Sequence, residues 1–217
     1  MAQRRGPRLI LASGSPRRKA LLRQLGVSYT VKASHVSEDS NQAIPRRLVE
    51  ELALRKAEAT AKLLASLGRG IKGEGTAVWV LGADTIVVLG RKILGKPKDV
   101  KDAYRMLYRL SNSVHQVYTG VALVEANGAR RWVTHAVSHV RMKKMPLDQI
   151  LRLSQKHLDK AGAYAIQDRN DPYAHLVRGS YENVVGLPLD VTEKLLRKAG
   201  FKIKRQRGSP LTTAGMT

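Results

Sequence analysis

The chain has 217 residues, enough for one large domain or for two lobes that share a core. Its hydrophobic content of 43% is ordinary for a globular protein. The absence of cysteine excludes disulfides, thiolate metal sites and cysteine nucleophiles.

The formal net charge of +22 indicates either a surface that attracts polyanions or simply many solvated lysines and arginines. Aromatic residues make up only 5% of the chain, which is poor equipment for stacking single-stranded bases, so nucleic-acid binding is not expected. No apolar run reaches the roughly 18 residues that a membrane span needs, and the N-terminus lacks the pattern of a secretory signal. We therefore predict a cytoplasmic protein that does not bind membranes.

Predicted strands and helices alternate along the chain. In chain order they are a strand at 8–12, a helix at 16–25, an edge strand at 29–33, a helix at 45–67, strands at 77–89 and 93–94, a helix after 99, strands at 114–125 and 130–142, and helices that begin at 146 and 188. Ser15 can cap the first helix, with Pro16 in its first position. Asn127 and Gly128 form a hairpin signal between the two long strands. The alternation predicts an α/β protein with a mixed sheet.

The chain shows no internal repeat and no long linker, so we predict a single domain over residues 1–207. The segment 67–76 is rich in glycine and is predicted to be a surface loop. The polar tail 208–217 is predicted to be disordered.

The segment 13–18 reads SGSPRR and lies between the first predicted strand and the helix that follows it. At the start of a helix the backbone amides are unpaired, and the helix dipole adds partial positive charge. Further hydrogen-bond donors at this point come from the side chains of Ser13, Ser15, Arg17 and Arg18. Arginine's planar fork matches phosphate oxygens. The segment therefore fits either a phosphate site or a helix cap followed by solvated arginines.

Asp84 interrupts a run of buried-strand residues, LGADT. A carboxylate there is costly unless a metal, a cation or hydrogen-bond donors receive it. This favours a metal ligand or a general base for water over a strand end that meets solvent. If Gly90 and Arg91 form a hairpin turn, pairing back from it brings Lys96 next to the Asp84 region, although Lys96 fits an exposed strand end equally well.

Three further residues have weaker signals. Lys56 lies in the apolar stripe of the long helix, where it can enter a cleft and meet phosphate or extend out to solvent. Glu38 lies in a polar loop, where carboxylates are usually solvated. Gln167 carries an amide that could recognise a base edge, or it could be a turn residue.

Together these segments resemble the Maf family of nucleotide pyrophosphatases from about residue 9 to 196. The matching segments, in the family's order and spacing, read ASGSPRRKALL, LGADTIVV, GKP, LSNSVHQVYTGVAL, DKAGAYAIQ and GSYENVVGLPL. The form DKAGAYAIQ looks like the subfamily that acts on dTTP and UTP, rather than the one that acts on 7-methyl-GTP.

The resemblance implies a two-lobed α/β fold with a central cleft, related to the ITP pyrophosphatases and often dimeric, so a homodimer is expected. It also implies a house-cleaning enzyme that hydrolyses a nucleoside triphosphate between its α and β phosphates, with Mg²⁺ or Mn²⁺. Asp84 matches the family's catalytic acid or base, and Glu38 is a second candidate metal ligand. The positions held to set substrate preference are matched by Arg17, Thr85 and Gln167. The cleft residues that bind phosphate, metal or water are matched by Ser13, Ser15, Arg18, Glu38, Lys56 and Lys96.

One departure leaves the preferred nucleotide open. The family usually has glycines after the glutamine, but here Asp168 to Asp171 (DRND) follow Gln167. Two other functions are consistent with the chain: a basic nucleic-acid-binding module, and a nucleotide-sensing protein that keeps the fold without turnover. Neither would release pyrophosphate.

Overall fold

The computed structural model describes residues 6–67, 77–168 and 170–205. Except for its first residue, the expected loop at 67–76 lies outside the described residues, as does the predicted tail at 208–217. Helices are α1 (Pro16–Arg23), α2 (Pro45–Ser66), α3 (Val100–Leu110), α4 (Leu147–Ser154), α5 (Tyr181–Val185) and α6 (Leu189–Lys198), with a 3₁₀ turn η1 (Ala161–Ala163). Strands are β1 (Arg8–Leu11), β2 (Tyr29–Val31), β3 (Val78–Leu89), β4 (Lys92–Leu94), β5 (Val114–Glu125), β6 (Arg131–Met142) and β7 (Ala174–Arg178).

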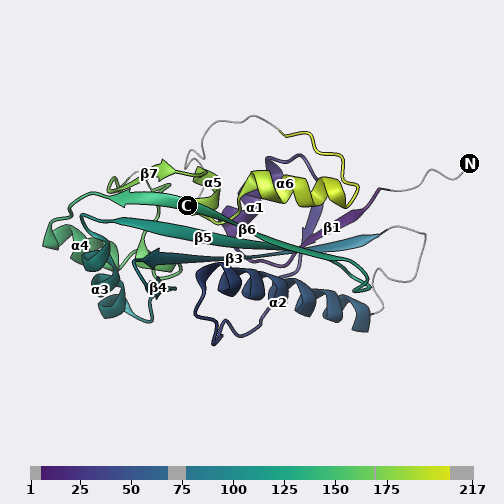
Figure 1. Ribbon diagram of the computed structural model, residues 1–217, viewed down its shortest axis with the longest axis horizontal. Helices are drawn as coiled ribbons and strands as arrows, with labels where there is room; N and C mark the ends of the chain where they lie inside the picture. Colours follow the sequence, from purple (N-terminus) through teal and green to yellow (C-terminus); the bar gives the residue numbers. More distant parts are fainter. Residues whose placement is uncertain (1–5, 68–76, 169, 206–217) are drawn as a thin grey trace, which may run out of the picture. The chain divides into compact units, whose positions relative to one another are not determined.

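The described strands join in one mixed sheet in the order β2-β1-β3-β5-β6-β7, with β4 paired to β3 (Figure 1). The predicted α/β class with a mixed sheet is confirmed. No helix in the described segments is both long and apolar enough to cross a membrane.

The chain divides into two compact units, and strands β3, β5 and β6 each run from one unit into the other. The first unit takes the described residues of Met1–Asp84, Thr119–His135 and Gly186–Arg207. The second takes those of Thr85–Tyr118 and Ala136–Val185.

In the first unit, β1 pairs in parallel with both β2 and β3, and α2 lies against one face of the strands while α1 and α6 lie against the other (Figure 1). Two glycines let the backbone of α2 approach the strands. A Cβ on Gly82 would lie 2.2 Å from the carbonyl oxygen of Ala53, and a Cβ on Gly120 would lie 2.1 Å from that of Val49. Helix α2 is therefore held at a separation that no larger residue permits at these two points.

The first unit also contains an aromatic stack with a cation on each side. The rings of Trp79 and Trp132 lie 4.8 Å apart between centroids, at an interplanar angle of 15°. The guanidinium of Arg130 lies 4.8 Å from the centre of the Trp79 ring, and the ammonium of Lys198 lies 4.7 Å from that of Trp132. The stack thus ties the β5–β6 hairpin and α6 to β3.

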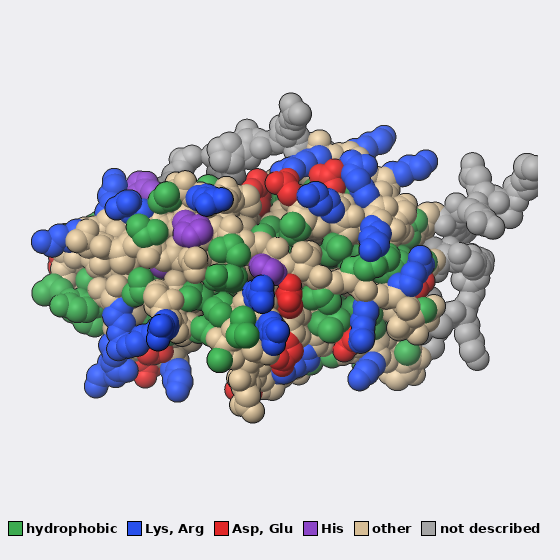
Figure 2. Space-filling view, viewed as in Figure 1, with side chains coloured by type: hydrophobic (Ala, Val, Ile, Leu, Met, Phe, Trp, Pro, Cys, Tyr) green, Lys and Arg blue, Asp and Glu red, His purple; other side chains and the backbone are tan. Residues whose placement is uncertain are grey.

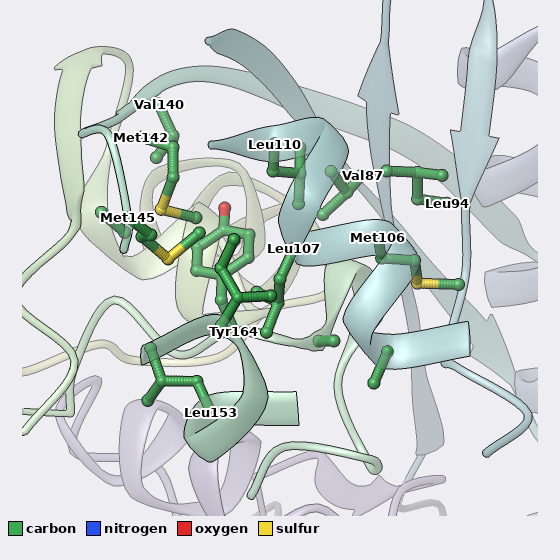
Figure 3. Packing of buried hydrophobic residues seen from close by; sticks show 14 of the residues in the cluster. Val87, Leu94, Met106, Leu107, Leu110, Val140, Met142, Met145, Leu153 and Tyr164 are labelled. Carbon is green, nitrogen blue, oxygen red and sulfur yellow. The ribbon is translucent and has the colours of Figure 1, made fainter. Parts of the chain in front are cut away.

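The second unit has its own apolar core, in which Tyr164 lies among side chains from α3, α4 and the strands (Figure 3). The Tyr164 hydroxyl and Nε2 of His115 are joined by a 2.7 Å hydrogen bond. Burial lowers the pKa of His115 to about 4, because the cationic form would have to leave water. Burial, followed by the nearby positive charge of Lys160, lowers the pKa of His157 to about 4 as well.

Because of these two histidines, we expect the free energy of unfolding to fall in mild acid. Between pH 6.5 and about 4, His115 and His157 are protonated in the unfolded chain but remain neutral in the folded chain. Stability is therefore full above pH 6.5 and decreases as the pH falls towards 4, by up to ~3 kcal/mol for His115 and by less for the less deeply buried His157. Urea unfolding from pH 7.5 to 4.5 measures this loss.

A variant isolates the part that belongs to one histidine. His115→Gln should reduce the slope of unfolding free energy against pH by about one proton in this range. The exposed His35, changed to Gln, is the matched control and should leave the slope unchanged. A His115→Gln slope equal to that of the wild-type protein would show that this histidine is not held neutral.

Candidate functional site

Three charged side chains meet in the first unit. The ammonium of Lys56, on α2, donates to Oδ1 of Asp84, on β3, at 2.6 Å and to Oε1 of Glu38 at 2.8 Å. Lys56 is 8% exposed and Asp84 is 6% exposed, whereas the Glu38 side chain is 44% exposed. The ion pair offsets the cost of burying the charges of Lys56 and Asp84. Asp84 and Glu38 form a carboxylate pair, of which only Glu38 is in contact with solvent to a large extent.

The close approach of α2 explains how Lys56 reaches Asp84. Gly82 and Asp84 are two residues apart on β3 and so point to the same face of the strand. A Cβ on Gly82 would meet the backbone of Ala53 and Ala57, which flank Lys56 on the helix. The glycine therefore brings the turn of α2 that carries Lys56 down onto the strand beside Asp84.

The predicted phosphate loop 13–18 is ordered by its own serines. Ser15 caps α1, and its hydroxyl accepts from the amide of Arg18 at 3.5 Å. The hydroxyl of Ser13 accepts from the amide of Ser15 at 3.3 Å and from Nη1 of Arg18 at 3.4 Å. Nε of Arg18 donates to the carbonyl of Gly186 at 2.8 Å. The arginine is thus fixed across the start of the helix.

Arg18 lies in the field of the carboxylate pair. Burial lowers its pKa, the charges of Asp84 and Glu38 raise it, and the neighbouring charge of Arg17 lowers it. Arg18 of the predicted phosphate loop thus interacts electrostatically with Asp84 and Glu38. The candidates that lie in the first unit are Ser13, Ser15, Arg17, Arg18, Glu38, Lys56 and Asp84. The remaining candidates belong to the second unit.

Of those candidates, Thr85 follows Asp84 on β3 and is half-buried. The two-residue turn at Gly90 and Arg91 is confirmed, because β3 and β4 pair from Leu89–Lys92 to Val87–Leu94. That ladder ends before Lys96, which is exposed.

The segment around Gln167 is a compact turn. The amide of Asp168 donates to the carbonyl of Ala165 at 3.0 Å, and Lys156 pairs with the Asp168 carboxylate at 2.6 Å. Although burial acts to raise it, the pKa of Asp168 is lowered by its hydrogen bond with Lys156. Asp171 is 2% exposed, and burial raises its pKa. Asp168 and Asp171, which stand in the segment where the family usually has glycines, thus stabilise the turn that contains Gln167.

The chemistry of the carboxylate pair suits a hard divalent cation. Mg²⁺ takes oxygen ligands and is typically held by one or two carboxylates together with substrate phosphates. Glu38 and Asp84 both place an oxygen within hydrogen-bond distance of one ammonium nitrogen, so the two carboxylates converge. Among the described residues no group of three or more histidine, aspartate or glutamate side chains could hold a metal ion. A cation here would therefore rely on two protein carboxylates and on the substrate.

Three features of this region have no counterpart in the sequence predictions. They are the carbonyl of Gly186, which fixes Arg18, the two glycines under α2, and Arg55, which binds the loop that carries Glu38. Gly186 lies within the segment GSYENVVGLPL, but no sequence pattern identifies a backbone carbonyl as an anchor. A buried strand glycine such as Gly82 does signal close backbone approach.

Comparison with known proteins identifies the family to which the sequence is similar. The sequence model of the family described as "Maf-like protein" matches residues 8–199. A protein of Elusimicrobium minutum named dTTP/UTP pyrophosphatase is 40% identical over 195 residues, covering 89% of this chain and 100% of the relative. One of Symbiobacterium thermophilum with the same name is 44% identical over 198 residues, covering 90% and 95%.

A solved structure is also similar over most of the chain. It is described as a nucleoside-triphosphatase, or dITP/XTP pyrophosphatase, from Mycobacterium abscessus, and it covers 88% of this chain and 93% of its own. The TM-score is 0.41 at 13% sequence identity, which is below the level that shows a shared fold.

Proposed function

Because this chain belongs to the Maf-like protein family, we propose that it is a nucleoside triphosphate pyrophosphatase that hydrolyses dTTP and UTP to the monophosphate and pyrophosphate. The observation that carries the proposal is the Asp84–Lys56–Glu38 arrangement, in which Asp84 and Lys56 are buried and both carboxylates interact electrostatically with Arg18 of the predicted phosphate loop. Relatives of about 40% identity over nearly their whole length share the name that states this activity.

In this proposal some residues bind the phosphates and one accepts a proton. Arg17, Arg18 and the positive end of α1 hold the triphosphate tail, and Ser13 and Ser15 keep that surface in place. Water adds to a phosphorus, the bridging P–O bond breaks, and its electron pair leaves with the departing phosphate group. Asp84 accepts the proton of the attacking water. Catalysis is mostly positioning and charge neutralisation.

Lys56 and a divalent cation have separate tasks in this proposal. Lys56 orients Asp84 through its 2.6 Å contact. Glu38 and Asp84 would hold Mg²⁺ or Mn²⁺, which supplies charge stabilisation on the phosphate oxygens when it is bound. For the candidates of the second unit the proposed roles are contact with phosphate for Lys96 and with the nucleoside for Thr85 and Gln167.

The test is release of pyrophosphate from a panel of nucleoside triphosphates, with Mg²⁺ and Mn²⁺ in turn. We expect dTTP and UTP to be cleaved to monophosphate and pyrophosphate, and excess EDTA to abolish at least ~99% of the activity, because the phosphates then lose their charge partner. Restoring either metal should restore turnover. In ¹⁸O-labelled water, label in the monophosphate identifies attack at the α phosphorus, and label in pyrophosphate identifies the β phosphorus.

Two results would contradict the proposal. One is the absence of pyrophosphate release from every nucleotide with either metal. The other is binding of oligonucleotides that weakens steeply with salt, without turnover, as expected of a nucleic-acid-binding protein. Lysine and arginine side chains lie over much of the visible face, with acidic ones among them (Figure 2). The aromatic content of 5%, which is poor for stacking bases, argues against the second result.

Three further expectations accompany the proposed function. The protein is expected to be a homodimer, to work in the cytoplasm and to use residues 1–207 as one functional domain. Light scattering of the purified chain tests the first.

A further inference from the structure

One arginine binds the backbone on both sides of Glu38. Nη1 of Arg55, on α2, donates to the carbonyl of Ser37 at 2.9 Å and to the carbonyl of Asp39 at 2.7 Å. These two carbonyls belong to the residues on either side of Glu38. One guanidinium nitrogen therefore fixes the backbone both before and after the proposed metal ligand.

A second contact braces this arginine from its own helix. Nη2 of Arg55 donates to Oε1 of Glu51, one turn earlier on α2. The hydroxyl of Ser40 donates to both carboxylate oxygens of Glu51, at 3.2 and 3.1 Å. Glu51 thus links Arg55 to Ser40, which follows Glu38 in the loop. It also holds the planar guanidinium in one orientation.

The arginine supplies a constraint that regular secondary structure does not give this loop. Residues 32–44 form neither helix nor strand, and the Glu38 side chain is 44% exposed. Lys56 contacts the Glu38 carboxylate itself, whereas the adjacent Arg55 contacts only the backbone around it. Two consecutive residues of α2 therefore fix one carboxylate, one through its oxygen and the other through its main chain.

We infer that Arg55, braced by Glu51, is a positioning residue that holds Glu38 in the geometry needed to bind the divalent cation. This inference rests on the proposed function in assigning Glu38 to the cation. It requires no contact between Arg55 and the nucleotide. Positioning to within a fraction of an ångström is what a metal-ligating carboxylate requires, and the residues around it supply that precision.

The first test uses the protein alone. Hydrogen exchange of the amides at 37–42 should be ~10-fold faster in Arg55→Gln than in wild type, because the loop opens more often once its two carbonyl contacts are lost. Arg47→Gln is the matched control, since Arg47 is an exposed arginine of the same helix and loses the same charge. Exchange in β5 and α6 should be unchanged in both variants.

The second test measures the cation directly, without turnover. Titration with Mn²⁺, followed by its electron paramagnetic resonance signal, should give a dissociation constant ~10-fold higher for Arg55→Gln than for wild type or Arg47→Gln. In a Glu38→Gln background, Arg55→Gln should have little further effect, because the residue through which it acts is already gone. Arg55→Lys keeps the positive charge but loses the planar guanidinium. Its dissociation constant for Mn²⁺ should lie between those of wild type and Arg55→Gln.

The outcomes separate this inference from the proposed function. Equal loop exchange in Arg55→Gln and Arg47→Gln, or equal Mn²⁺ affinity in both, overturns the positioning role even if the wild-type protein releases pyrophosphate. Full additivity of the Arg55 and Glu38 changes also overturns it, since Arg55 would then act elsewhere. Faster exchange and weaker Mn²⁺ binding in a protein that cleaves no nucleotide would uphold the positioning role and reject the proposed function.

Discussion

Asp84→Asn is expected to reduce the turnover of dTTP and UTP by ~10²–10⁴-fold, because the amide can neither accept the proton of the attacking water nor give its charge to a cation. The fold should survive the change. The amide oxygen of asparagine can still accept the hydrogen bond that Lys56 now gives to Asp84 Oδ1 at 2.6 Å. Pyrophosphate release under saturating nucleotide, compared at equal protein concentration, measures the loss.

The control for this prediction separates chemistry from folding. Asp148→Asn removes a carboxylate from an exposed position at the start of α4 and should leave turnover within about twofold. Circular dichroism and the melting temperature of Asp84→Asn establish that the protein is folded when it is assayed. A pure, folded preparation of Asp84→Asn that retains wild-type turnover would remove Asp84 from the reaction.

Gly120→Ala should destabilise the protein by about 3 kcal/mol or more, or ~10 °C in Tm. The added Cβ would lie 2.1 Å from the carbonyl oxygen of Val49 and 2.3 Å from its carbonyl carbon. Main-chain atoms of a helix cannot rotate aside as a side chain can, so α2 would have to move away from the strands. Gly82→Ala meets the carbonyl oxygen of Ala53 at 2.2 Å and should behave in the same way.

These glycine variants need a control that adds the same methyl group without a clash. Gly95→Ala provides it, because no atom lies within 4 Å of the added Cβ. Its unfolding free energy in urea should stay within about 0.5 kcal/mol of wild type. Wild-type stability in Gly120→Ala would mean that α2 does not approach the strand as closely as the structure has it.

Most of the fold could be predicted because its local signals agree with its tertiary packing. The cap at Ser15, the turn at Gly90 and the hairpin at Gly128 all lie where the sequence predicts them, and the element ends that were predicted agree to within two residues. The short elements η1, β7 and α5 were not predicted. Strand β7 has only one buried residue and is defined by its pairing with β6, so its sequence carries no clear alternation.

The candidate site was predictable where burial makes a charge conspicuous. Asp84 and Lys56 interrupt apolar patterns, and each proves to be the other's partner. Their pairing could not be predicted, because it depends on how closely α2 approaches β3. Arg55 gave no signal at all: an arginine on the outer part of a helix looks solvated until the loop that it binds is known.

The stacked tryptophans have a consequence for spectroscopy. Trp79 and Trp132 are the chain's two tryptophans, and both belong to the first unit. Indole emission consequently reports the melting of that unit and is blind to the other, whose chromophores are tyrosines. A denaturation profile followed by indole emission and one followed by far-ultraviolet ellipticity would diverge if the two halves lose structure separately, and would superimpose if they melt as one cooperative body.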